Sequence, residues 1–133
     1  MAHLHGGIVT SIDIVGEALS ERPELLDRLQ RLLGLVEDGR IDPAILDLCR
    51  KRVGTLLGCP IHAAALPAGD DLDETERACL DFCELFVIDH TAISDADAAL
   101  VSERLGDAGM VAFTTALALY DGFCRFEILM AGG

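Results

Sequence analysis

Apolar residues recur at intervals of three and four along most of this chain, which is the spacing of one face of an α-helix. Ser20 and Pro23 mark the start of a first helix, and the polar stretch 37–40 marks its end. Asp42 followed by Pro43 caps a second helix. The apolar positions of these two predicted helices are Leu25, Leu26, Leu29, Leu32, Leu33 and Val36, then Ile45, Leu46, Cys49, Val53, Leu56 and Leu57.

The second half of the chain has the same periodicity and further helix starts. Asp73 and Glu76 form a capping-box pattern that opens a helix predicted to run to about His90. Ser94 caps a shorter helix, and Asp107 caps a long terminal helix. The apolar positions here are Leu80, Cys83, Phe86, Val87, Ala98, Leu100, Val101, Leu105, Met110, Phe113, Leu117, Tyr120, Cys124 and Ile128.

No useful stretch alternates between polar and apolar residues as a half-buried strand does. We therefore predict an all-α fold with a single bundle of about six helices over residues 20–133. Residues 1–19 are predicted to be an N-terminal arm or a short helix. Residues 1–7 contain no lysine or arginine, so we expect no signal peptide, which would begin with a positively charged region.

The composition argues against several classes of function. The net charge of −13 at pH 7 argues against binding to nucleic acid or to an anionic membrane, because both require a basic patch. The longest apolar run, 108–120, is shorter than the ~20 residues that span a bilayer. Five cysteines, an odd number, do not form a secreted disulfide framework, so we expect a cytoplasmic protein. A mean hydropathy of +0.38 in so charged a chain indicates apolar surface buried in a homo-oligomer.

The main candidate for chemistry is the stretch 56–64, which places Cys59, Pro60 and His62 near an expected helix start. At the positive end of a helix dipole, Cys59 would favour the thiolate, and His62 would share its helical face. Asp47, on the preceding helix, could orient the imidazole. The alternative is that Cys59 is a small apolar residue at a helix start and His62 a polar residue at a subunit boundary.

Other polar clusters have simpler interpretations. The basic run 50–52 is predicted to be a salt-bridged or solvated helix face. Cys79 and Cys83, four apart, are typical of core packing, although either could approach Cys59 and act as a second thiol. Cys49 and Cys124 occupy apolar positions. Cys59 and His62 could ligate zinc, but no second Cys/His pair has fitting spacing, so we predict no metal and no cofactor.

The run from Asp42 to Ala64 resembles the core of the alkylhydroperoxidase D (AhpD)/carboxymuconolactone decarboxylase superfamily. Three later stretches resemble further elements of that family in the same order: Leu72 to Ala78, Ser94 to Asp97 and Leu119 to Arg125. The resemblance implies an AhpD-like helical fold. It also implies a homo-oligomer, because the related proteins are commonly trimers or hexamers.

The resemblance is incomplete at the family's functional positions. Cys59 matches the first cysteine of the family's Cys-x-x-Cys, whereas His62 stands where the second is expected. Leu66 occupies the position of the family's histidine, and Asp47 falls where its glutamate is expected. The ordinary cycle of a two-cysteine peroxidase cannot run on this motif alone.

We therefore predict an AhpD-like, thiol-dependent oxidoreductase that reduces a peroxide or a disulfide at a single motif cysteine. In this hypothesis Cys59 reacts, His62 activates it and Asp47 orients His62. The oxidised Cys59 is then reduced by another cysteine of the protein or by an external thiol reductant as partner. The alternatives are a non-redox enzyme of the decarboxylase branch, with His62 as acid or base, and a non-catalytic oligomer that binds a small ligand.

Overall fold

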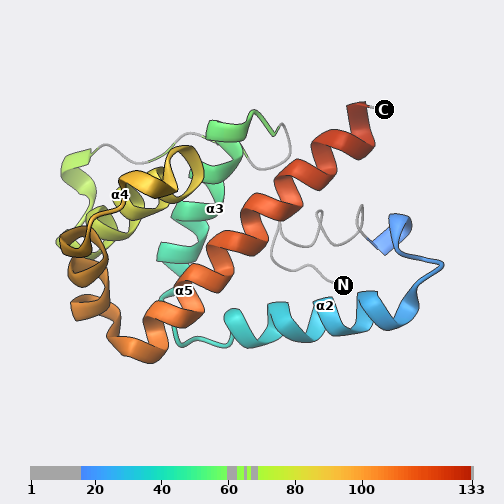
Figure 1. Ribbon diagram of the computed structural model, residues 1–133, viewed down its shortest axis with the longest axis horizontal. Coiled ribbons are helices and arrows are strands. Elements are labelled where there is room, and N and C mark those ends of the chain that lie inside the picture. The colour runs from blue at the N-terminus through green and yellow to red at the C-terminus, as the bar shows by residue number, and fades with distance from the viewer. Residues whose placement is uncertain (1–15, 60–62, 65, 67–68, 133) are drawn as a thin grey trace.

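The computed structural model describes residues 16–59, 63–64, 66 and 69–132, and Figure 1 shows their arrangement. The four long helices in this part of the chain are α2 (Pro23–Val36), α3 (Pro43–Leu57), α4 (Glu74–Ile88) and α5 (Asp95–Gly132). Two short 3-10 helices, η1 (Gly69–Asp71) and η2 (His90–Ala92), flank α4. The described residues contain no strand, which confirms the all-α prediction.

The expected count of about six helices is not confirmed in the part of the chain that the structure describes. The two helices predicted after Ser94 and Asp107 are the two parts of α5, which is interrupted at Gly106 with φ 76° and ψ 169°. Only glycine adopts this backbone conformation readily, and Figure 1 shows the chain turning sharply before the long second part of α5. The helix expected after Cys59 does not include Ala63, Ala64 or Leu66, which are not helical. Of the predicted N-terminal arm, 16–18 are helical and 1–15 lie outside the described residues.

Local capping chemistry explains where most helices begin. The Asp42 carboxylate accepts a hydrogen bond from the Ala44 N–H at 2.9 Å, as predicted for the start of α3. The capping box of α4 is complete, with Asp73 and Glu76 each accepting from the other's backbone N–H. Ser94 is likewise bonded to the Asp97 N–H at 3.1 Å. The prediction for Ser20 is wrong, because α2 begins at Pro23 and no side chain caps it.

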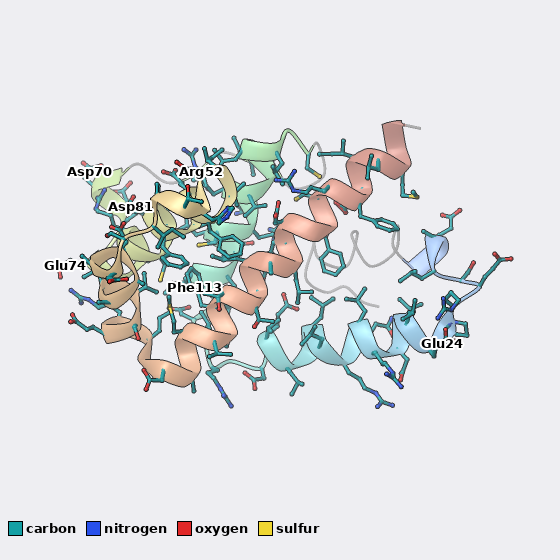
Figure 2. The ribbon with its side chains drawn as sticks, in the orientation of Figure 1. Glu24, Arg52, Asp70, Glu74, Asp81 and Phe113 are labelled. Atoms are coloured by element: carbon teal, nitrogen blue, oxygen red, sulfur yellow. The ribbon has the colours of Figure 1, made fainter. Side chains whose placement is uncertain are left out.

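The core lies where α3, α4 and α5 pack against one another, while α2 contacts α5 at the edge of the molecule (Figure 1). This position explains why only Leu33 and Val36 of the predicted apolar stripe on α2 are buried. In the centre of the core the Phe113 ring of α5 lies 6.0 Å from the Phe82 ring of α4, and Figure 2 shows Phe113 between these helices. None of the described helices is long and apolar enough to cross a membrane.

The terminal part of α5 presents one continuous buried face to α3 and α4. Successive residues of this face are Phe113, Leu117, Tyr120, Cys124 and Glu127, spaced by three and four. The sequence-based prediction placed Ile128 at the end of this stripe, and that assignment is wrong because Ile128 is 37% exposed whereas Glu127 is 1% exposed. At 3.6 residues per turn, the face that starts at Phe113 returns at position 127, so a carboxylate enters the core.

Candidate functional site

Cys59 lies just beyond the carboxyl end of α3. Gly58 has the left-handed conformation, φ 74° and ψ 28°, which ends the helix and turns the chain. The Cys59 N–H then donates back to the Gly54 carbonyl at 2.8 Å, which fixes the cysteine backbone. The side chain of Cys59 has no exposed surface.

This placement changes the expected electrostatics. Cys59 was predicted at the positive, amino-terminal end of a helix, but in the structure it follows the carboxyl end of α3, where the helix dipole is negative. His62 and Pro60 lie outside the described residues, so the predicted pairing of Cys59 with His62 stays a prediction.

Two side chains of α5 meet Cys59. The Cys59 thiol donates a hydrogen bond to Oε2 of Glu127 at 3.4 Å, and Cys124 lies one helical turn before Glu127 on the same buried face. The two sulfur atoms and a carboxylate oxygen of Glu127 all lie within 4.8 Å of one another. All three residues are fully or almost fully buried. We call Cys59, Cys124 and Glu127 the thiol–carboxylate cluster.

The surroundings of Cys124 favour its neutral form. Burial raises the pKa of the Cys124 thiol far above its ordinary value, and the neighbouring Cys59 and Glu127 raise it further. Cys124 is therefore a thiol, not a thiolate, at neutral pH in the folded protein. A reaction at this sulfur requires a proton acceptor, and a carboxylate of the cluster lies within reach.

Asp47 is not part of this cluster. Its carboxylate pairs with Arg50 at 2.6 Å and with Lys51 at 2.8 Å on a half-exposed face of α3. Partial burial opposes ionisation, but the hydrogen bonds from Lys51 and Arg50 outweigh it and lower the pKa of Asp47. Asp47 is ten residues before Leu57, about 15 Å along the axis of α3. The structure therefore brings Glu127, and not Asp47, to Cys59.

The basic run on α3 forms ion pairs, in agreement with the salt-bridged face predicted for it. Besides the two partners of Asp47, Arg52 pairs with Glu84 of α4 at 2.5 Å, and Figure 2 shows Arg52 beside that helix. On α5, Asp121 and Arg125 form the intrahelical pair that their spacing indicates, at 2.7 Å.

The remaining three cysteines form a separate cluster between α3 and α4. The Cys49 thiol lies 3.9 Å from the Cys79 carbonyl oxygen, and the Cys83 thiol lies 3.8 Å from the Cys49 carbonyl oxygen. Because Cys49 is ten residues before Cys59 and eight before the end of α3, this cluster lies at a different level of the helix from Cys59. The hypothesis that Cys79 or Cys83 provides the second thiol is therefore not supported, and Cys124 occupies that place.

Sequence reasoning missed both partners of Cys59. Cys124 was assigned to the core, which is correct as far as burial goes, and Glu127 was not considered. One signal was present in the sequence: Glu127 continues the spacing of Phe113, Leu117, Tyr120 and Cys124. A carboxylate at a position that periodicity assigns to the core is costly to bury, so it indicates a partner or a function.

The arrangement can support three kinds of chemistry: transfer of a proton from a thiol to a carboxylate, formation of a bond between two sulfurs, and coordination of a cation by sulfur and oxygen. Comparisons of this chain with protein-family models, with curated proteins and with solved structures found no match. The functional conclusions therefore depend on the cluster itself.

Proposed function

We propose that this protein is an AhpD-like, thiol-dependent oxidoreductase that reduces a peroxide at Cys59, with Cys124 as the second thiol. The observation that carries the proposal is the meeting of two sulfurs and a carboxylate in one buried cluster. The missing second cysteine of the motif near Cys59 is thereby replaced by a cysteine from another helix. This arrangement supplies a resolving thiol within the same chain, where the sequence alone left an external donor open.

The reaction proceeds in three balanced steps. Glu127 accepts the proton of the Cys59 thiol, and the sulfur attacks one peroxide oxygen. The O–O bond breaks, the leaving oxygen takes the proton from Glu127 and departs as an alcohol or water, and Cys59 becomes a sulfenic acid. The Cys124 sulfur, losing its proton, then displaces water from the sulfenic acid and forms a disulfide with Cys59. Two equivalents of an external thiol finally reduce the disulfide, restoring both thiols and leaving the oxidised donor.

The disulfide step requires a modest movement. The two sulfurs lie within 4.8 Å of one another, whereas a disulfide bond is about 2.05 Å long. Side-chain rotation at Cys59, which follows the last turn of α3 and is not itself helical, can supply part of this approach. Complete burial of Cys59 also favours a small oxidant such as hydrogen peroxide over a protein disulfide.

The other two predicted site residues have different support. The proposal that His62 activates Cys59 rests on the spacing of the two residues in the sequence. Asp47 was predicted to orient His62, but its pairing with Arg50 and Lys51 supports a structural role. We assign acceptance of the Cys59 proton to Glu127, which receives the hydrogen bond of that thiol.

Hydrogen peroxide is expected to convert the reduced protein into a form with a Cys59–Cys124 disulfide. The reduced full-length protein, freed of reductant and held in a chelator, is treated with one equivalent of peroxide, alkylated and analysed by peptide mass spectrometry. Cys59→Ser should slow peroxide consumption by about 100-fold or more. Cys124→Ser should stop at the Cys59 sulfenic acid, which dimedone traps.

The matched control is Cys83→Ser, which removes an equally buried thiol from the other cluster and should leave the reaction unchanged. Peroxide consumption by Cys59→Ser at the wild-type rate would contradict the proposal. So would oxidation that is spread equally over all five cysteines. The two alternatives, a lactone decarboxylase and a ligand-binding protein, both predict that no disulfide forms at Cys59.

We also propose that the protein is a homo-oligomer, such as a trimer or hexamer. Leu35 of α2 and Val111 of α5 are both about two-thirds exposed and line one groove between these helices, which supports an apolar contact there. Light scattering should give three or six times the chain mass of 14.2 kDa, and Leu35→Glu together with Val111→Glu should dissociate the assembly. A wild-type monomer at micromolar concentration would contradict this proposal.

A further inference from the structure

We infer that Cys59, Cys124 and Glu127 form a binding site for one zinc ion. The three ligand atoms lie within 4.8 Å of one another. In a tetrahedral zinc site, bonds of about 2.3 Å to sulfur and about 2.1 Å to oxygen place neighbouring ligand atoms about 3.6 Å apart. The distance of 3.4 Å between the Cys59 sulfur and Oε2 of Glu127 is already close to this value.

The donor types select the class of metal. Thiolate sulfur favours zinc over magnesium and calcium, which are bound mainly by oxygen. One carboxylate and two thiolates are common zinc ligands, and three protein ligands leave the fourth position for water or a small anion. This is the coordination found in catalytic zinc sites rather than in closed structural ones.

Two elements of the fold, α5 and the end of α3, hold the three ligand residues in place. Cys124 and Glu127 project from one turn of α5, so their relative position is set by a helix. Cys59 is fixed by the hydrogen bond of its N–H to the end of α3. A site built on ordered elements binds with less loss of conformational entropy than one built on a free loop.

A bound zinc ion would also compensate the negative charge of its three ligands. Two thiolates and a carboxylate in a buried place carry three negative charges, which is strongly unfavourable without a cation. In the metal-free protein this cost is absent when both thiols are protonated. Zinc must displace these protons, so binding should release protons and weaken as the pH falls.

This inference departs from the sequence-based prediction of no metal. That prediction depended on finding a second Cys/His pair, whereas Cys124 and Glu127 provide a Cys-x-x-Glu pair from a helix far along the chain. Zinc binding does not depend on the proposed redox function, because it needs only reduced thiols and a carboxylate. Bound zinc would withhold both sulfurs from peroxide, which links metal binding to the peroxide reaction.

The experiment measures binding of zinc and cobalt salts to the reduced full-length protein after treatment with a chelator and its removal. The protein carries His3→Ala and His5→Ala so that the short histidine pair near Met1 cannot bind metal. We expect one zinc ion per chain by calorimetry and elemental analysis, with proton release. Cobalt should give the intense near-ultraviolet absorption of a thiolate–cobalt bond, together with the visible bands of tetrahedral coordination.

Variants locate the ion. Cys59→Ser, Cys124→Ser and Glu127→Gln should each weaken zinc binding by about 10-fold to 100-fold or more, whereas Cys83→Ser should bind like the parent protein. Circular dichroism confirms that each variant is folded, and the cobalt absorption of the parent protein reports thiolate ligation even if a variant fails to fold. Absence of this absorption, or equal binding by folded Cys124→Ser, would overturn the inference.

The peroxide assay is done in a chelator, so the two proposals fail separately. Zinc binding without a Cys59–Cys124 disulfide supports the metal site and contradicts the redox function. Disulfide formation without zinc binding overturns the metal site and leaves the redox function standing.

Discussion

Raising the pH from 8 to 10 is expected to lower the free energy of unfolding by about 4–6 kcal/mol, because three buried thiols resist ionisation. A hydrogen bond with Cys83, followed by burial, raises the pKa of Cys49 well above its ordinary value. Burial raises the pKa of Cys79 to about 12 and also raises that of Cys124. The unfolded chain ionises its thiols near pH 8.5–9.

The sign of this pH effect on stability follows from the number of protons bound in each state. Above pH 9 the folded state holds more protons than the unfolded state, so stability present at neutral pH is lost as the pH rises toward the folded-state pKa values. The slope approaches about 1.4 kcal/mol per pH unit for each thiol only above its unfolded-state pKa, so each thiol contributes about 1.4–2 kcal/mol between pH 8 and 10. Since domains of this size are stable by about 5–15 kcal/mol, the effect is large enough to bring the protein near its unfolding midpoint.

Urea unfolding at pH 7.5, 8, 9 and 10 measures this loss of stability. The unfolding is followed by circular dichroism in a metal-free buffer that contains a reductant. Cys79→Ala removes one titrating thiol and should reduce the loss by about a third, even though the variant is less stable at pH 7.5. A high-salt series separates the thiols from general repulsion in a chain of net charge −13. An identical loss in Cys79→Ala and wild type would show that net charge, and not the buried thiols, is responsible.

Helix positions were predicted well from the sequence because their causes are local. The caps at Asp42, Asp73 and Ser94 depend on side chains that bond to backbone groups two or three residues away. Proline at the start of α2 and α3 and glycine near their ends act over the same short range. Such signals need no knowledge of which helices become neighbours.

The candidate site was predicted only in part, because its key contacts join residues that are far apart in the sequence. Cys59 was singled out by its sequence neighbours, but its partner Glu127 is 68 residues away. A choice among Cys79, Cys83 and Cys124 as the nearby thiol requires the packing of α3 against both α4 and α5, which a single sequence does not specify.

Two sequence features near Cys59 support opposite electrostatic predictions. Pro60 suggests that a helix begins there, which would place Cys59 at a positive end, whereas Gly58 suggests that a helix ends there. In the structure Gly58 decides, because its left-handed conformation ends α3 directly before Cys59. A glycine after a long apolar stripe is therefore the stronger signal here. If Gly58 had been weighted above Pro60, Cys59 would have been placed correctly at the carboxyl end of a helix.

Phe113→Ala is expected to lower the free energy of unfolding by about 3–5 kcal/mol, the cost of removing a large side chain from a well-packed core. Phe113 has no exposed surface, and its ring packs 6.0 Å from that of Phe82, which in turn lies 6.4 Å from Phe86. The loss combines apolar surface returned to water, a cavity between α4 and α5, and a missing aromatic contact. Urea unfolding at pH 7.5 measures it.

A graded series separates burial from helix propensity. Phe113→Leu retains most of the apolar volume and should cost less than half as much as Phe113→Ala. Leu129→Ala, on the same helix but 71% exposed and outside the groove proposed as an interface, should change stability by no more than about 0.5 kcal/mol. Because Phe113 is 14 residues from Glu127, about 21 Å along the helix, folded Phe113→Leu should retain the peroxide reaction of the wild type. Equal losses for Phe113→Ala and Leu129→Ala would mean that the interface between α4 and α5 is not the centre of the core.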